Sequence, residues 1–171
     1  MRVRAPSPLP TGYQRRDLEA VGFVGWLSWA ALRTSRLAEL PRSPGSYVIY
    51  RDAATAPRFV AVGAGGHFKG RDPNVTVETL QAEWVAGAHA VYIGKASELR
   101  SRLRTYANFG AGRPVGHYGG RYIWQLADAH ELLVAWRALP TADLARADEV
   151  ALLGHFRELH GGDWPLANLT G

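Results

Sequence analysis

The stretch HAVYIGKASELRSRLRTYANF, residues 89–109, places the strongest constraint on the fold. It opens with an apolar, β-rich run that ends at a glycine, which predicts a strand over 89–94. Residues 98–109 follow with helical periodicity, and Ser97 is the expected N-cap of that helix. A strand that leads directly into an amphipathic helix indicates a helix packed on a sheet.

The remaining segments extend this pattern in both directions. Strands are expected at 45–51, 58–63, 121–127 and 131–139, and helices at 14–21, 26–40, 77–85 and 142–160. Thr76 and Thr141 are expected to cap the last two helices. The sequence therefore predicts an α+β domain with a small antiparallel or mixed sheet flanked by helices.

Length and composition narrow the class of protein. A chain of 171 residues with 47% apolar residues is expected to be globular, with an N-terminal arm and helical extension at 1–43 and the main domain at 44–171. There is no cysteine, which excludes disulfides and thiolate metal sites. Neither a signal peptide nor a membrane-spanning run is recognisable, so we expect a cytoplasmic protein that acts away from membranes, as a monomer or a homodimer.

Positive charge is concentrated in one part of the chain. The segment from Lys95 to Arg121 holds six of the 20 Lys and Arg residues against one Glu, and so carries the whole formal net charge of +5. A localised basic segment is typical of a protein that binds a polyanion, and DNA is the partner we expect. The alternative is an arginine-rich surface that is only solvated.

The arginines of the 98–109 helix are not equivalent. Leu99, Leu103 and Tyr106 form one apolar stripe, and Arg102 lies at its edge. Arg100 and Arg104 are expected to point toward solvent. A guanidinium beside a core-facing stripe indicates an anionic partner such as a phosphate. The alternative is that Arg102 extends to a surface carboxylate.

A second unusual charge lies in the 142–160 helix. Leu152, Leu153 and Phe156 follow Glu149 at helical spacing, which places Glu149 at the centre of the apolar face and Asp148 to the side. A carboxylate on a core face needs a cation. Two interpretations remain open, namely a divalent-cation ligand and an ion pair with Arg102.

Taken in order, these motifs resemble the GIY-YIG endonuclease superfamily. A GSY run lies in one expected strand and YIGKA in a later one, with Arg, Tyr, Glu and Asn following. The second part is similar to the nuclease domain of the bacterial excision-repair incision protein. The resemblance rests on Gly45, Ser46, Tyr47, Tyr92, Gly94, Lys95, Ala96, Leu99, Arg102, Leu103, Tyr106, Glu149 and Asn168.

Three features depart from the family pattern. Ser46 replaces an aliphatic residue of the first motif. Tyr47 and Tyr92 are 45 residues apart instead of roughly ten, which implies an insertion at about 52–88 between paired strands. Asn168 follows Glu149 by 19 residues, more than is usual.

The resemblance implies hydrolysis of DNA phosphodiester bonds with one Mg²⁺ or Mn²⁺, held by Glu149. Arg102 would stabilise charge in the transition state. Tyr47 or Tyr92 would orient or deprotonate the attacking water, with its pKa lowered by Lys95 and Arg102.

The other expected roles are supporting ones. Tyr106 would hydrogen-bond the phosphate or the water, and Asn168 would brace the helix of the metal site. Candidates for contacts to the DNA backbone are Arg100, Arg104, Arg113, His117 and Arg121.

Two other functions compete with the nuclease. One is a catalytically silent nucleic-acid-binding module on the same fold. The other is an interaction protein with an exposed patch formed by Trp26, Trp29 and Trp84.

Overall fold

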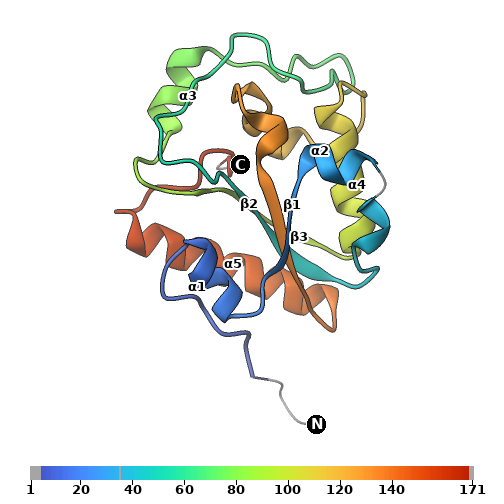
Figure 1. Cartoon of the computed structure of the whole chain (residues 1–171), viewed down its shortest axis with the longest axis vertical. Coiled ribbons are helices and arrows are strands. Elements are labelled where there is room, and N and C mark those ends of the chain that lie inside the picture. Colours follow the sequence, from blue (N-terminus) through green and yellow to red (C-terminus); the bar gives the residue numbers. More distant parts are fainter. Residues whose placement is uncertain (1–4, 35, 170–171) are drawn as a thin grey trace.

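The computed structural model describes residues 5–34 and 36–169 and is built on one four-stranded antiparallel sheet (Figure 1). The strands are β1 (Val24–Ser28), β2 (Gly45–Tyr50), β3 (Ala90–Ala96) and β4 (Leu133–Ala138), in the spatial order β1-β4-β2-β3. The expected α+β class is confirmed, and the sheet is antiparallel throughout.

Helices cover both faces of the sheet, so the molecule has three layers (Figure 1). The α-helices are α1 (Arg15–Ala20), α2 (Trp29–Thr34), α3 (Val77–Glu83), α4 (Leu99–Gly110) and α5 (Ala142–Leu159). The 3-10 helices are η1 (Arg36–Glu39), η2 (Tyr118–Gln125) and η3 (Ala129–Glu131). One core lies under α2, α3, α4 and η2, and the other lies under α1 and α5.

Strand β2 is buried along its whole length because it has a partner strand on each side and helices over both faces. Its side chains alternate between the two cores, as the pleat of a strand requires. Tyr47 and Ile49 enter the core beneath α4, while Val48 and Tyr50 enter the core beneath α5. This strand fixes how α4 and α5 lie relative to each other.

A buried ion pair ties α5 to the sheet. Asp148 is 5% exposed and accepts hydrogen bonds from Arg137 of β4 and from the hydroxyl of Ser46 on β2. Arg137 also donates to the carbonyls of Pro8 and Val21, at 2.9 Å each. The pair therefore holds the N-terminal segment, two strands and α5 together.

The buried position of Asp148 corrects the expected face of α5. The helix buries Ala145, Asp148, Leu152 and Phe156, whereas Glu149 is only half-buried. Neighbouring helical residues differ by about 100° in direction. The expected position of Glu149 at the centre of the apolar face is therefore wrong, because burial of Asp148 turns Glu149 out of the core. The buried ion pair joins Arg137 to Asp148, and the alternative pair of Arg102 and Glu149 is not among the ion pairs of the described residues.

Several expected elements are confirmed. Strands at 45–51, 89–94 and 131–139 correspond to β2, β3 and β4, and helices at 14–21, 77–85, 98–109 and 142–160 correspond to α1, α3, α4 and α5. The hydroxyls of Thr76 and Thr141 accept from the backbone N–H groups of Thr79 and Leu144, as N-caps do. The segment 52–88 connects the paired strands β2 and β3 and contains α3.

The expected single helix at 26–40 is correct only in part. Strand β1 begins before it and pairs with β4, and only the short helices α2 and η1 follow. Gly25 and Trp26 have φ values of 104° and 55° at a bulge in β1. A Cβ on Gly25 would lie 2.2 Å from the ring of Trp136, so this position requires glycine. The N-terminal extension thus supplies an edge strand of the sheet as well as helices.

Two other expected strands and one expected cap are also wrong. Residues 121–127 lie largely in the 3-10 helix η2, and residues 58–63 make only an isolated bridge, between Phe59 and Leu126. The N-cap of α4 is Glu98 instead of Ser97, and its side chain makes no capping bond. The N–H groups of Leu99 and Arg100 instead donate to the backbone carbonyls of Ser43 and Pro41, in the segment that leads into β2.

Within the described residues, no helix has both the length and the apolar content needed to cross a membrane.

Replacement of Asp148 by Ala is expected to lower the free energy of unfolding by about 3–5 kcal/mol, because it leaves the buried Arg137 charge without a partner. Urea unfolding measures this change. The matched control is Glu158→Ala, which removes an exposed carboxylate from the same helix and is expected to cost less than about 0.5 kcal/mol. A loss below about 1 kcal/mol for Asp148→Ala would show that the ion pair does not hold the layers together.

Candidate active site

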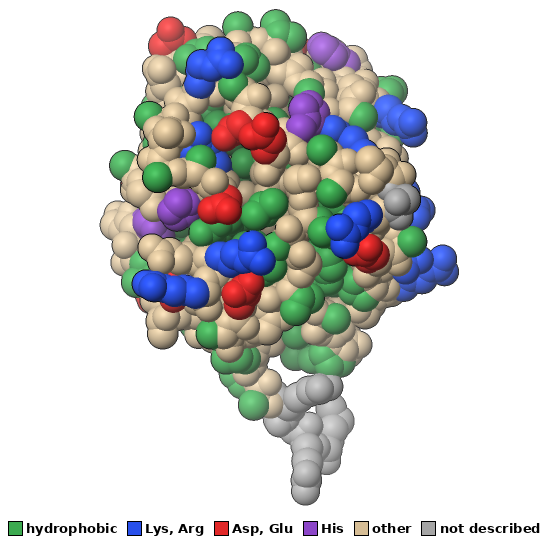
Figure 2. All heavy atoms as spheres, in the orientation of Figure 1, with side chains coloured by type: hydrophobic (Ala, Val, Ile, Leu, Met, Phe, Trp, Pro, Cys, Tyr) green, Lys and Arg blue, Asp and Glu red, His purple; other side chains and the backbone are tan. Residues whose placement is uncertain are grey.

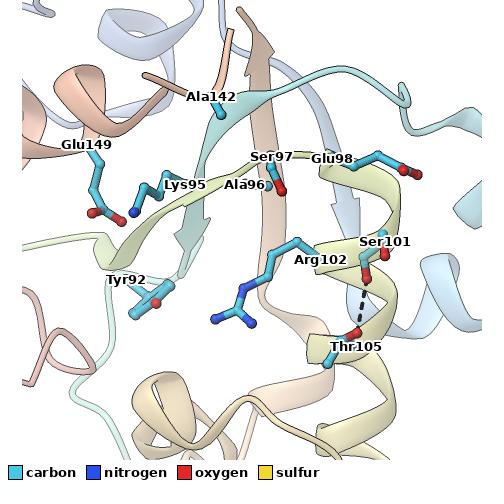
Figure 3. Close-up of a pocket in the computed structure, with 10 residues that line it drawn as sticks. All are labelled: Tyr92, Lys95, Ala96, Ser97, Glu98, Ser101, Arg102, Thr105, Ala142 and Glu149. Carbon is cyan, nitrogen blue, oxygen red and sulfur yellow. Dashed lines mark hydrogen bonds between the residues drawn. The ribbon is translucent and has the colours of Figure 1, made fainter. Parts of the chain in front are cut away.

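A polar pocket of about 770 Å³ opens where β3, α4 and α5 meet (Figure 3). Its lining includes four residues that the sequence singled out, Tyr92, Lys95, Arg102 and Glu149. The other lining residues are Ala96, Ser97, Glu98, Ser101, Thr105 and Ala142. The structure therefore brings together side chains from three elements that are far apart in the sequence.

The pocket forms around β3 because β3 is an edge strand. Successive side chains of a strand point to opposite faces. Lys95 shares a face with Ile93, in the α5 layer, and Tyr92 belongs to the core on the α4 side. Lys95 and Glu149 thus reach the pocket from one face of the sheet, while Tyr92 and Arg102 reach it from the other.

The Glu149 carboxylate is partly shielded from solvent and has positively charged neighbours. Burial raises the pKa of its carboxyl group, and the charges of Lys95, Arg102 and Arg146 act in the opposite direction. In Figure 3 the Glu149 carboxylate and the Lys95 ammonium group point toward each other. The arrangement suits a carboxylate that meets a cation at the mouth of the pocket.

Tyr47 lies behind Tyr92 and does not reach the surface. Its ring is fully buried, with its centroid 5.9 Å from that of Tyr92. Gly94 lies directly opposite Tyr47 on β3. A Cβ on Gly94 would lie 2.5 Å from Cζ of Tyr47, so only glycine lets the Tyr47 ring cross β3 toward the pocket.

The expectation that nearby cations lower the tyrosine pKa is wrong. Burial raises the pKa of Tyr92 above its usual value and that of Tyr47 well above it, and Arg102 offsets only part of this effect. Both phenols are therefore protonated near neutral pH. A role for either tyrosine would therefore fall to the protonated hydroxyl group and not to a phenolate.

Tyr106 and Asn168 occupy positions that differ from their expected roles. The Tyr106 hydroxyl is buried and donates to the carbonyl of Gly120 at 2.6 Å, so it is not available to a phosphate. Asn168 pairs through its side-chain amide with the backbone N–H and C=O of Ile93, at 2.9 and 2.8 Å. Asn168 thus covers the edge of β3 and does not brace α5.

The expected DNA-contact residues fall into two groups. Arg104 and Arg113 are exposed. Arg100, by contrast, donates to the carbonyls of Ala38 and Leu40, and the Arg121 guanidinium lies 3.8 Å above the ring of Tyr118. Figure 2 shows positive and negative side chains interspersed on the visible face, so the charge excess is not gathered there.

His117 is buried, so the expectation that it contacts the DNA backbone from a glycine-rich loop is wrong. The side chain is 1% exposed, its ring centroid lies 3.4 Å from that of Tyr106, and Nε2 lies 3.2 Å from the Tyr47 hydroxyl. Burial and the charge of Arg102 lower the pKa of His117 well below its usual value, so the imidazole is neutral. No local pattern in residues 110–120 indicated this position.

The residues of the pocket fit one magnesium-type ion with many water ligands. The described residues contain no group of three or more His, Cys, Asp or Glu that would enclose a metal. Mg²⁺ usually keeps several waters and takes only one or two carboxylates. The half-buried Glu149 would supply one such ligand, and the open pocket leaves room for water.

The tryptophan patch expected for an interaction protein is not formed. Trp26 and Trp29 are buried, and Trp84 is partly buried against Phe59. This removes the observation on which that alternative depended.

Comparisons with known proteins identify no relative. No protein-family model matches the chain, and neither a curated protein nor a solved structure matches it.

The buried His117 predicts a specific loss of stability in acid. An unfolded histidine titrates near pH ~6.5, whereas folded His117 stays neutral to lower pH. Below pH ~6.5 the unfolded chain therefore binds the proton preferentially, and the free energy of unfolding falls by up to about 1.4 kcal/mol per pH unit. Urea unfolding at several pH values gives the free energy of unfolding as a function of pH. Below pH ~6.5 this free energy is expected to fall less steeply for His117→Gln than for the wild type. Equal slopes in the two proteins would contradict the buried, neutral state.

Proposed function

We propose that this protein is a cytoplasmic, metal-dependent endonuclease that hydrolyses DNA phosphodiester bonds, with a GIY-YIG-type fold and mechanism. The observation that carries the proposal is the convergence of Tyr92, Lys95, Arg102 and Glu149 on one pocket. These four residues belong to the motifs whose order in the sequence resembles that superfamily. A common surface site was not guaranteed by their order along the chain.

Arg102 is suited to stabilise the anionic transition state. Its guanidinium group lines the pocket and is half-buried, where electrostatic interactions are stronger than in bulk water. Phosphoryl transfer depends mainly on positioning and on stabilising charge at the phosphate oxygens. Lys95 adds a second positive charge on the other side of β3.

Glu149 would hold the divalent cation, Mg²⁺ or Mn²⁺. When bound, such an ion neutralises charge on the scissile phosphate and on the leaving oxygen. Glu149 also places its carboxylate next to the Lys95 ammonium group, which helps to orient the lysine side chain at the pocket (Figure 3).

Tyr92 is the tyrosine that can contact the attacking water, because it lines the pocket and Tyr47 does not. Its protonated hydroxyl is able to orient the water by hydrogen bonding. Tyr47 supports Tyr92 and Arg102 from behind. The proposed catalytic residues therefore line the pocket, and the buried ring of Tyr47 packs beneath them.

The proposal is tested by incubating the full chain with supercoiled plasmid and with linear, branched, damaged and single-stranded DNA, with Mg²⁺ or Mn²⁺ and with excess chelator. Nicking that requires the metal is expected on at least one substrate. A folded protein that binds DNA but cleaves none of these substrates would instead be the silent nucleic-acid-binding module.

Replacement of Arg102 by Gln is expected to lower the single-turnover cleavage rate by about 10²–10³-fold, because one preorganised donor to the transition state is lost. The loss is measured on the best substrate from the panel. Arg16→Gln is the matched control, since Arg16 is an exposed arginine of α1 that does not line the pocket. Cleavage by Arg102→Gln at the rate of the control would contradict the assigned site.

A further inference from the structure

We propose that His117 is a positioning residue that holds the Arg102 guanidinium at the pocket, through the carbonyl of the neighbouring residue Gly116. The inference rests on the proposed nuclease function. It deepens that function by assigning a role to a buried imidazole that lies outside the expected motifs and does not line the pocket.

The His117 ring is held on three sides by tyrosines of the site. Its centroid lies 3.4 Å from the Tyr106 ring on α4 and 5.9 Å from the Tyr92 ring on β3. Its Nε2 lies 3.2 Å from the hydroxyl of Tyr47 on β2. Gly120 also packs closely against the ring, since a Cβ there would lie 2.9 Å from Cε1 of His117. The imidazole is therefore fixed relative to α4 and to two strands.

The backbone that leads to His117 is tightly turned. The N–H of Val115 donates to the carbonyl of Arg113, and the N–H of His117 donates to the carbonyl of Val115. These are two consecutive three-residue turns. Because one end of this short segment is the buried His117, the Gly116 peptide next to it has little freedom to move.

Arg102 binds this fixed peptide. Its guanidinium donates to the Gly116 carbonyl at 3.3 Å. An arginine side chain carries about 2 kcal/mol of rotamer entropy, so a bond to a fixed carbonyl narrows the directions that the guanidinium samples. His117 thereby orients Arg102 before substrate arrives, which is the kind of preorganisation that electrostatic catalysis requires.

The charge state of His117 is consistent with this role. The groups that face the imidazole are the phenols of Tyr47, Tyr92 and Tyr106 and the guanidinium of Arg102. A protonated imidazole would repel Arg102. The neutral ring has one donor and one acceptor nitrogen, so Nε2 can hydrogen-bond the Tyr47 hydroxyl in either tautomer without placing a positive charge beside the guanidinium.

A double-mutant cycle between His117 and Arg102 tests the inference. Single-turnover cleavage is measured for the wild type, His117→Ala, Arg102→Gln and the double variant, at a temperature where circular dichroism shows each to be folded. His117→Ala alone is expected to lower the cleavage rate about 10–100-fold with little change in KM. In the Arg102→Gln background the same change is expected to have less than a twofold effect, because the two substitutions remove the same interaction.

Two further variants separate positioning from general stability. His117→Gln provides an acceptor for the Tyr47 hydroxyl and is expected to recover part of the lost rate. His130→Ala replaces an exposed histidine outside the pocket and is expected to leave the rate within twofold of the wild type. Effects of His117→Ala and Arg102→Gln that multiply in the double variant, or an unchanged rate in folded His117→Ala, would overturn the inference.

Failure of the inference is distinguishable from failure of the proposed function. If the wild type binds DNA without cleaving it, the nuclease proposal fails, and the same cycle measured on DNA affinity decides whether His117 acts through Arg102. Additive losses of affinity would then overturn the positioning role. If the wild type neither cleaves nor binds DNA, both proposals are overturned.

Discussion

The buried contact between Arg137 and Asp148 determines the arrangement on which the candidate site depends. It joins α5 to β4 and, through Ser46, to the central strand β2. Burial of a charged pair is costly unless both partners are well hydrogen-bonded, and this pair fixes the rotation of α5 about its axis. Asp148 faces the core as a result, and Glu149, the next residue, turns toward Lys95 and the pocket. The buried carboxylate of Asp148 thus determines where the carboxylate of Glu149 lies.

The edge strand β3 supplies the second half of the site. Tyr92 and Lys95 leave this one strand toward opposite faces, so the pocket curves around the edge and draws on both helical layers. Asn168 pairs with the backbone of β3 at Ile93 and limits its exposure as a free edge. Gly94 lets the Tyr47 ring cross beneath, so the pocket rests on a packed aromatic layer.

The strand and helix order from β2 to α5 was largely readable because periodicity and caps agree there, as at Thr141. The N-terminal strand β1 was not readable, since its bulge at Gly25 depends on the ring of Trp136, which is distant in sequence. The spacing of Asp148 to its apolar neighbours was enough to predict the buried face of α5. Nothing in the sequence indicated, however, that Arg137 would be the ion-pair partner that stabilises the buried Asp148. His117 escaped notice because only tertiary packing buries that glycine-rich loop.

We propose that the Glu149 carboxylate, turned outward by the buried pair of Arg137 and Asp148, supports phosphodiester hydrolysis. The most direct measurement is metal-dependent DNA cleavage by Glu149→Gln beside Glu158→Gln, an exposed change on the same helix. Glu149→Gln is expected to keep its fold and its DNA binding but to lose at least about 10²-fold in single-turnover rate, while Glu158→Gln is expected to cleave as the wild type does. Equal cleavage by the two variants would show that Glu149 has no part in the hydrolysis.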